Sequence, residues 1–87
     1  MNIVETDRFR RSFSDLPKII KMKAQKQFRL FLENIFHTSL HTEKLEPRIK
    51  NIWSFRLDRK YRVIFTFRPE KDEIWFLDVG SHDIYKR

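Results

Sequence analysis

Alternating apolar and polar residues in the last third of the chain predict three β-strands. They cover residues 52–57, 61–68 and 73–79, and each shows the two-residue period of a strand. Polar turns at residues 58–60 and 69–72 separate them. Because turns this short join antiparallel neighbours, we expect an antiparallel sheet.

The first 36 residues repeat their apolar positions with the period of an α-helix instead. After a short strand at Ile3 and Val4, Asp7 is the predicted N-cap of a first helix. A second helix is expected to begin between Asp15 and Pro17. Residues 37–50 show no sustained period and predict a long connection. The apolar stripes of the two helices are Phe9, Phe13 and Leu16, and then Ile20, Ala24, Phe28, Phe31 and Ile35, widened by Leu32 and Phe36.

These elements predict an α+β fold in a single domain, residues 1–87. The two N-terminal helices should pack as a hairpin on one face of a small, mainly antiparallel twisted sheet. Strand parity then assigns the side chains to faces. The helix-covered face is expected to carry Trp53, Phe55, Leu57, Tyr61, Val63, Phe65, Phe67, Trp75, Leu77 and Val79. The opposite face is expected to carry Ser54, Arg56, Arg62, Ile64, Thr66, Ile74, Phe76 and Asp78.

Composition narrows the class of protein. The chain has no cysteine, which excludes a disulfide framework and a thiolate metal site. Nine Phe and two Trp supply the apolar volume that so small a core needs. No apolar run approaches the ~20 residues of a membrane span, and the charged N-terminus is unlike a signal sequence. We therefore expect a cytoplasmic protein without membrane contact.

A positive charge excess points to a polyanionic partner. Lys and Arg total 19 against 12 Asp and Glu, which gives a formal net charge of +7. Such a charge on a small domain attracts nucleic acid or an acidic protein. Two strand arginines, Arg56 and Arg62, lie on the predicted face away from the helices. The alternative for both observations is an ordinary solvated surface.

The element order and the C-terminal third resemble the RelE/ParE superfamily, the toxic halves of type II toxin–antitoxin pairs. The resemblance covers essentially the whole chain and is strongest in WSFRLDRKYRVIFTF and in the final VGSHDIYKR. Members such as RelE, YoeB and YafQ cleave messenger RNA in the ribosomal A site, whereas ParE-like members poison DNA gyrase. The resemblance thus implies a RelE-like fold, a messenger RNA and ribosome target, and a cognate acidic antitoxin as partner.

Residue by residue, the resemblance also implies a catalytic set. Arg62 matches the strand arginine that contacts the scissile phosphate, and Arg56 matches a cation near it. His82 lies where ribonuclease members place a tail His or Arg, and Tyr85 matches a tail aromatic residue. Ser54 replaces a strand lysine of RelE. RNA contacts are expected from Lys44, Arg48, Lys50, Ser54, Arg59 and Lys60.

Metal-independent RNA cleavage needs a base for the 2′-hydroxyl proton, an acid for the leaving 5′-oxygen, and cations for the charged phosphorane. Guanidinium groups suit the phosphate, and His82 is the tail side chain that titrates near neutrality. Tyr85 offers a stacking face for a splayed base. The base is not identified, and Glu43 and Glu46 in the connection are the candidates.

No cofactor and no metal are expected. His37 and His41 lie four residues apart, which is a ligand spacing, but no third ligand accompanies them.

Three functions remain open from the sequence: a ribosome-dependent endoribonuclease, a ParE-type gyrase inhibitor without catalysis, and a non-toxic relative that binds nucleic acid or an acidic partner. The tail residues His82 and Tyr85 favour the first. The alternative for Tyr85 is a terminal aromatic residue that closes the core.

Overall fold

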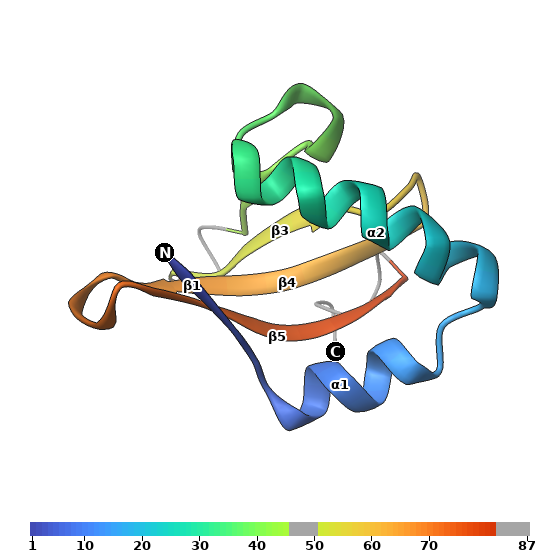
Figure 1. Ribbon diagram of the computed structural model, residues 1–87, viewed down its shortest axis with the longest axis horizontal. Helices are drawn as coiled ribbons and strands as arrows, with labels where there is room; N and C mark the ends of the chain where they lie inside the picture. The colour runs from blue at the N-terminus through green and yellow to red at the C-terminus, as the bar shows by residue number, and fades with distance from the viewer. Residues whose placement is uncertain (46–50, 82–87) are drawn as a thin grey trace.

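The computed structural model describes residues 1–45 and 51–81 and shows two helices packed on a five-stranded sheet (Figure 1). The strand order is β1-β5-β4-β3-β2. β1 runs parallel to β5, and the other neighbours are antiparallel. The elements in chain order are β1 (Asn2–Glu5), α1 (Asp7–Ser14), α2 (Lys18–Glu33), the 3₁₀ turn η1 (Thr38–Leu40), β2 (Glu43–Lys44), β3 (Trp53–Arg56), β4 (Tyr61–Arg68), the 3₁₀ turn η2 (Pro69–Lys71) and β5 (Glu73–Ser81).

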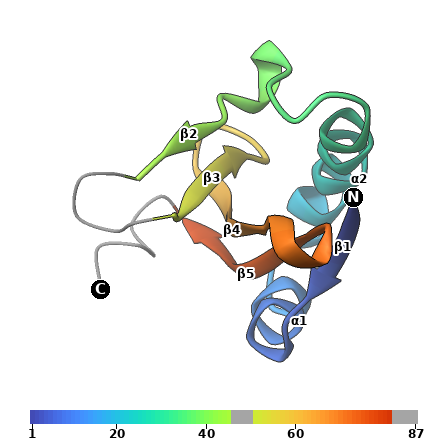
Figure 2. The same cartoon turned by 90° about the vertical axis from the view of Figure 1, so that its left-hand side faces the viewer.

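Both helices lie on one side of the sheet and run in opposite directions (Figures 1 and 2). The predicted fold class, two N-terminal helices on a mainly antiparallel sheet, is therefore confirmed. Within the described ranges, no helix combines the length and the apolar character that crossing a membrane requires. We call the sheet side that carries Ser54, Arg56, Arg62, Ile64 and Thr66 the far face, because it lies away from the helices.

α1 begins one residue earlier than expected, at a cap that also ties the helix to the sheet. The N-cap is Thr6, whose hydroxyl oxygen accepts a hydrogen bond from the Phe9 N–H at 3.2 Å. The same hydroxyl donates to the Phe76 carbonyl of β5 at 2.9 Å. Asp7 is instead the first helical residue, where its negative charge is favourable near the positive end of the helix dipole.

An aromatic cluster fills the space between the helices and the sheet. Phe31 of α2 stacks on Phe55 of β3 with ring centroids 4.5 Å apart, and it meets Phe65 and Phe76 edge-on at 5.2 and 5.5 Å. Phe9 of α1 reaches Phe76 at 5.3 Å. Such ring pairs add about 0.5–1.5 kcal/mol each beyond the burial of their area, so packed rings stabilise this small core without disulfides.

A β-bulge corrects the predicted faces of the last strand. Phe65 pairs with Phe76 but Ile64 pairs with Asp78, which leaves Leu77 as an extra residue in β5. The parity of β5 therefore changes at Leu77. Val79 lies in the core as expected, but Trp75 and Leu77 are only partly buried, whereas Ile74 and Phe76, expected on the opposite face, are core residues 1% and 3% exposed.

Asp78 contacts α1 although it lies opposite Ile64 in the strand pairing. Its carboxylate accepts hydrogen bonds from the Ser12 hydroxyl at 2.6 Å and from the Arg8 Nε at 3.2 Å, both in α1. The strand was expected to present Asp78 on the face away from the helices. Instead, the residue holds α1 against β5.

The connection after α2 contains more structure than its sequence indicates. η1 is followed by the two-residue strand β2, which pairs with β3 through Glu43 opposite Ser54. α2 ends at Glu33, so Phe36 lies beyond the helix and is exposed, as is Leu32. These two residues do not widen the buried stripe, which was the expectation for them.

The turn between β3 and β4 is fixed by a carboxylate. Asp58 accepts hydrogen bonds from the backbone N–H groups of Lys60 at 2.8 Å and Tyr61 at 2.9 Å, and the Lys23 Nζ lies 3.5 Å from it. Burial raises the pKa of Asp58, but the N–H groups of Tyr61 and Lys60, with Lys23, outweigh burial and hold the pKa below its ordinary value. Asp58 thereby fixes how β3 meets β4.

Replacing this carboxylate by an amide should destabilise the fold in a pH-dependent way. Because the folded pKa of Asp58 is lowered, its charge stabilises the native state above about pH 4, and this contribution is lost as the pH falls through the folded pKa. We expect Asp58→Asn to reduce the free energy of unfolding by about 1 kcal/mol at pH 7. Urea unfolding of both proteins should show the difference shrinking below about pH 4, and a difference that grows on acidification would contradict this account.

Candidate functional site

Two arginines lie directly opposite each other on neighbouring strands. Arg56, the last residue of β3, pairs in register with Arg62 near the start of β4. Their neighbours Phe55 and Val63 point to the helices and are fully buried, so strand alternation places both guanidinium groups on the far face. The sequence predicted this placement, and the structure confirms that the two side chains share one face and one register position.

The arginine pair is incompletely neutralised. The Arg62 side chain is 12% exposed, and its terminal nitrogen lies 3.2 Å from the Glu43 Oε1. In the described part of the chain, the Nε atoms of Arg56 and Arg62 are buried without a hydrogen-bond partner. Like charges directly opposite in a sheet are destabilising, and an unpaired buried donor adds to that cost. A site with these properties is poised to accept an anion.

Glu43 reaches the pair from β2. It lies opposite Ser54, two positions before Arg56 on β3, so both residues share a face with Arg56. The carboxylate is 54% exposed at the side chain and therefore remains accessible. The sequence left Glu43 and Glu46 as equal candidates because nothing in residues 37–50 signalled a strand. β2 now singles out Glu43 geometrically, and Glu46 lies outside the described residues.

The far face is not open throughout. Ser54, expected to contact RNA, is fully buried, and its hydroxyl has no partner among the described residues. Ile64 and Thr66 are buried as well, and the Thr66 hydroxyl donates to the Asn51 carbonyl. Ser54 thus forms the floor of the site beside Glu43 and Arg56.

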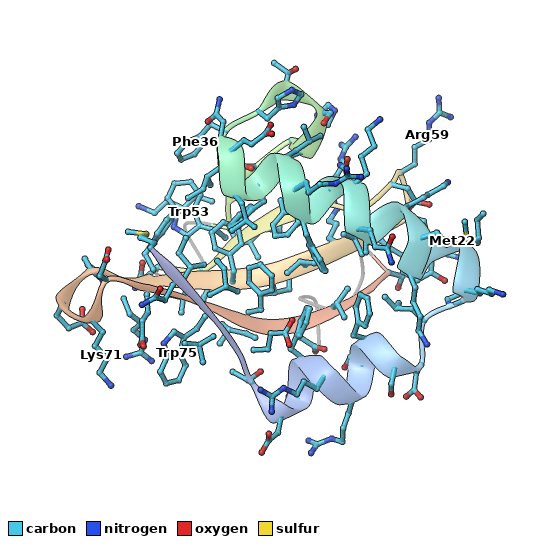
Figure 3. The ribbon with its side chains drawn as sticks, in the orientation of Figure 1. Met22, Phe36, Trp53, Arg59, Lys71 and Trp75 are labelled. Atoms are coloured by element: carbon cyan, nitrogen blue, oxygen red, sulfur yellow. The ribbon has the colours of Figure 1, made fainter. Side chains whose placement is uncertain are left out.

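The remaining expected RNA contacts divide into two groups. Arg59 and Lys60 lie in the turn that joins Arg56 to Arg62, and Figure 3 shows Arg59 extending away from the body of the protein. Lys44 lies on the other side of β2 from Glu43, with its ammonium 5.6 Å from the centre of the Trp53 ring. The expected residues outside the described ranges are Arg48, Lys50, His82 and Tyr85.

The histidines of the connection have a local role in the chain. His37 caps η1, and its Nδ1 lies 3.1 Å from the Ser39 hydroxyl, while His41 ends the turn in a left-handed conformation. Among residues 1–45 and 51–81, no three His, Asp or Glu side chains gather as a metal-binding group.

The described site combines two functions that phosphate chemistry requires. Two guanidinium groups side by side present several N–H donors in a geometry that matches phosphate oxygens. An accessible carboxylate beside them can accept a proton. A phosphodiester that binds the arginines would therefore lie within reach of the Glu43 carboxylate.

Comparison with known proteins identifies the fold. No protein-family model and no curated protein matches the sequence. Solved structures do match: YafQ from E. coli strain BL21(DE3) has a TM-score of 0.77, 12% identity, and coverage of 97% of this chain and 96% of its own. A YoeB/ParE toxin from Agrobacterium tumefaciens has a TM-score of 0.76, 15% identity, and coverage of 94% and 99%.

An archaeal RelE in complex with RelB, from Pyrococcus horikoshii OT3, is also similar, with a TM-score of 0.73, 16% identity, and coverage of 95% of this chain and 96% of that one. The protein therefore has the fold of the RelE/ParE toxins over nearly its whole length. The resemblance predicted from the sequence is confirmed at the level of the fold.

The repulsion between Arg56 and Arg62 should lower the free energy of unfolding of the protein. Arg56→Met keeps the apolar stem but removes the charge and the unpaired Nε. We expect it to raise the free energy of unfolding by about 0.5–1 kcal/mol. Denaturant unfolding measures this, with Arg59→Met in the exposed turn as the matched control that changes little. A clear loss of stability in Arg56→Met would show that the pair holds the fold together.

Proposed function

We propose that this protein is the toxin of a type II toxin–antitoxin pair and that it acts as a ribosome-dependent messenger RNA endoribonuclease. The fold supports the toxin role, because similar structures are those of YafQ, of a YoeB/ParE toxin, and of complexes of RelE with RelB and of YafQ with DinJ. The net charge of +7 suits both a ribosomal target and an acidic antitoxin.

The observation that carries the catalytic part of the proposal is the arginine pair with its single described carboxylate. An acidic protein partner would also pair with two like charges in register, but it would not need a proton-accepting carboxylate directly beside them. An enzyme that stabilises a phosphorane needs such preorganised cations, because they are worth most where water is excluded. The cost in stability is then explained by the chemistry.

The proposed reaction is an in-line transfer within the RNA. The Glu43 carboxylate takes the 2′-hydroxyl proton, and the 2′-oxygen attacks the adjacent phosphorus. Arg62 and Arg56 bind the non-bridging oxygens as negative charge accumulates on them. The bond to the 5′-oxygen breaks, and that oxygen leaves with a proton from a general acid. The products are a 2′,3′-cyclic phosphate and a 5′-hydroxyl end.

The remaining assignments are part of the proposal, and those to Arg48, Lys50, His82 and Tyr85 lie outside the described residues. His82 is the proposed general acid, since imidazole titrates near neutrality, and Tyr85 is proposed to stack on a base of the message. Arg48 and Lys50, together with Arg59 and Lys60 of the turn, would hold the RNA backbone electrostatically. Lys44 is proposed as a further contact at the edge of the sheet.

Removing the Arg62 guanidinium should abolish toxicity without unfolding the protein. We expect Arg62→Ala to relieve growth arrest on induction, whereas Arg29→Ala, an exposed residue of α2, should remain as toxic as the parent. Circular dichroism of the purified proteins checks that both variants stay folded. An Arg62→Ala protein that is folded and fully toxic would contradict the site.

The carboxylate is tested separately by an isosteric change. We expect Glu43→Gln to slow RNA cleavage on programmed ribosomes by about 10²–10⁴-fold, the usual loss of a general base. Single-turnover rates measured over a pH series should also lose the dependence on an acidic group. An unchanged rate would place the base elsewhere. Inhibition of DNA supercoiling by purified gyrase, without RNA cleavage, would favour the alternative of a ParE-type inhibitor.

A further inference from the structure

A second group of cations and an aromatic ring lies at the far end of β4. Trp75 of β5 is flanked by the core residues Ile74 and Phe76, so its side chain points away from the helices and is partly exposed. It lies next to the β4–β5 turn together with Lys71, and the two side chains are close in Figure 3. We call Arg68, Lys71 and Trp75 the tryptophan cluster.

The ring of Trp75 is held in place by a hydrogen bond, and two cationic side chains lie over it. The Arg68 guanidinium carbon lies 4.7 Å from the ring centre and the Lys71 ammonium 5.7 Å from it. The Trp75 Nε1 donates to the Glu73 carboxylate at 3.0 Å, which fixes the plane of the ring. Both cations are on exposed residues, and among the described residues neither forms an ion pair.

This combination matches one class of ligand. Single-stranded nucleic acid is bound by aromatic platforms on which a base stacks, together with cations that follow the backbone. A guanidinium stacked on an indole keeps its N–H edges free for phosphate oxygens. An acidic peptide would use the two charges but would have no need of the aromatic ring. The ring therefore favours RNA over a peptide.

The tryptophan cluster is separate from the arginine pair. Arg68 lies six residues after Arg62 on β4, which is about 20 Å along the strand. Between the two arginines on β4 lies Thr66, whose hydroxyl is bonded to the Asn51 carbonyl. The two sites must therefore contact different nucleotides.

We propose that Arg68, Lys71 and Trp75 form a second RNA subsite, in which one unpaired base stacks on Trp75 and the two cations bind its phosphates. The inference rests on the proposed function, because it assumes an RNA target. The RNA is either the message beyond the cut or an unpaired nucleotide of ribosomal RNA, and both have the same chemistry at this subsite.

Binding to a probe that cannot be cleaved tests the subsite. We expect Trp75→Ala to weaken binding of a fluorescent 2′-O-methyl dodecaribonucleotide, or of ribosomes without message, by at least about fivefold. Trp75→Phe should retain most of the affinity. Phe36→Ala, an exposed aromatic residue, and Arg29→Ala are the matched controls and should change little. Weaker binding of Trp75→Ala to the oligonucleotide would show that the subsite binds the message. Weaker binding to ribosomes alone would show that it binds ribosomal RNA.

Fluorescence gives an independent readout. In Trp53→Phe the remaining tryptophan is Trp75, so its emission should be quenched as the oligonucleotide is added. Unchanged affinity of Trp75→Ala for both probes, without quenching, would overturn the subsite even if Arg62→Ala abolishes cleavage. An equal loss of binding to poly-glutamate would overturn it in favour of an acidic peptide. If the parent protein neither binds nor cleaves RNA, the proposed function itself fails.

Discussion

The register between β3 and β4 places two guanidinium groups side by side, and the packing beneath the sheet maintains that register. A slip of β3 by one residue would turn Arg56 toward the helices and expel Phe55, and the same slip of β4 would turn Arg62 and expel Val63; both apolar residues are fully buried. Burying each apolar side chain contributes about 1.5–3 kcal/mol. A like-charge pair costs only about 0.2–1 kcal/mol, so the core outweighs the repulsion.

Three parts of the fold keep the arginine pair in place or complete it. The Asp58 turn sets how the strands meet, β2 supplies one carboxylate, and the rings around Phe31 hold the sheet against α2. The repulsion that remains is relieved by any anion that enters. Under the proposed function, an acidic antitoxin segment and an RNA phosphate would relieve the same repulsion, so neutralisation and catalysis would share one electrostatic basis.

Much of this structure could be predicted from the sequence, because local patterns determine it. The strand period located β4 at its observed bounds, and parity placed Arg56 and Arg62 on one face. Parity placed Val79 correctly but failed for Trp75 and Leu77, since a bulge leaves no periodic signal and reverses the faces of the residues before it relative to those after it. The position of Glu43 was equally hidden, because β2 has two residues and exists only through its pairing with β3. Tertiary contacts, and not propensity, decide such features.

Mapping the 5′ ends of cellular transcripts after induced expression is the sharpest test of the proposal that the arginine pair cleaves messenger RNA on the ribosome. We expect new 5′-hydroxyl ends in phase with codons, which disappear when translation is blocked and are missing in cells that express Arg62→Ala. Growth arrest without new ends, or ends that persist in Arg62→Ala, would contradict it.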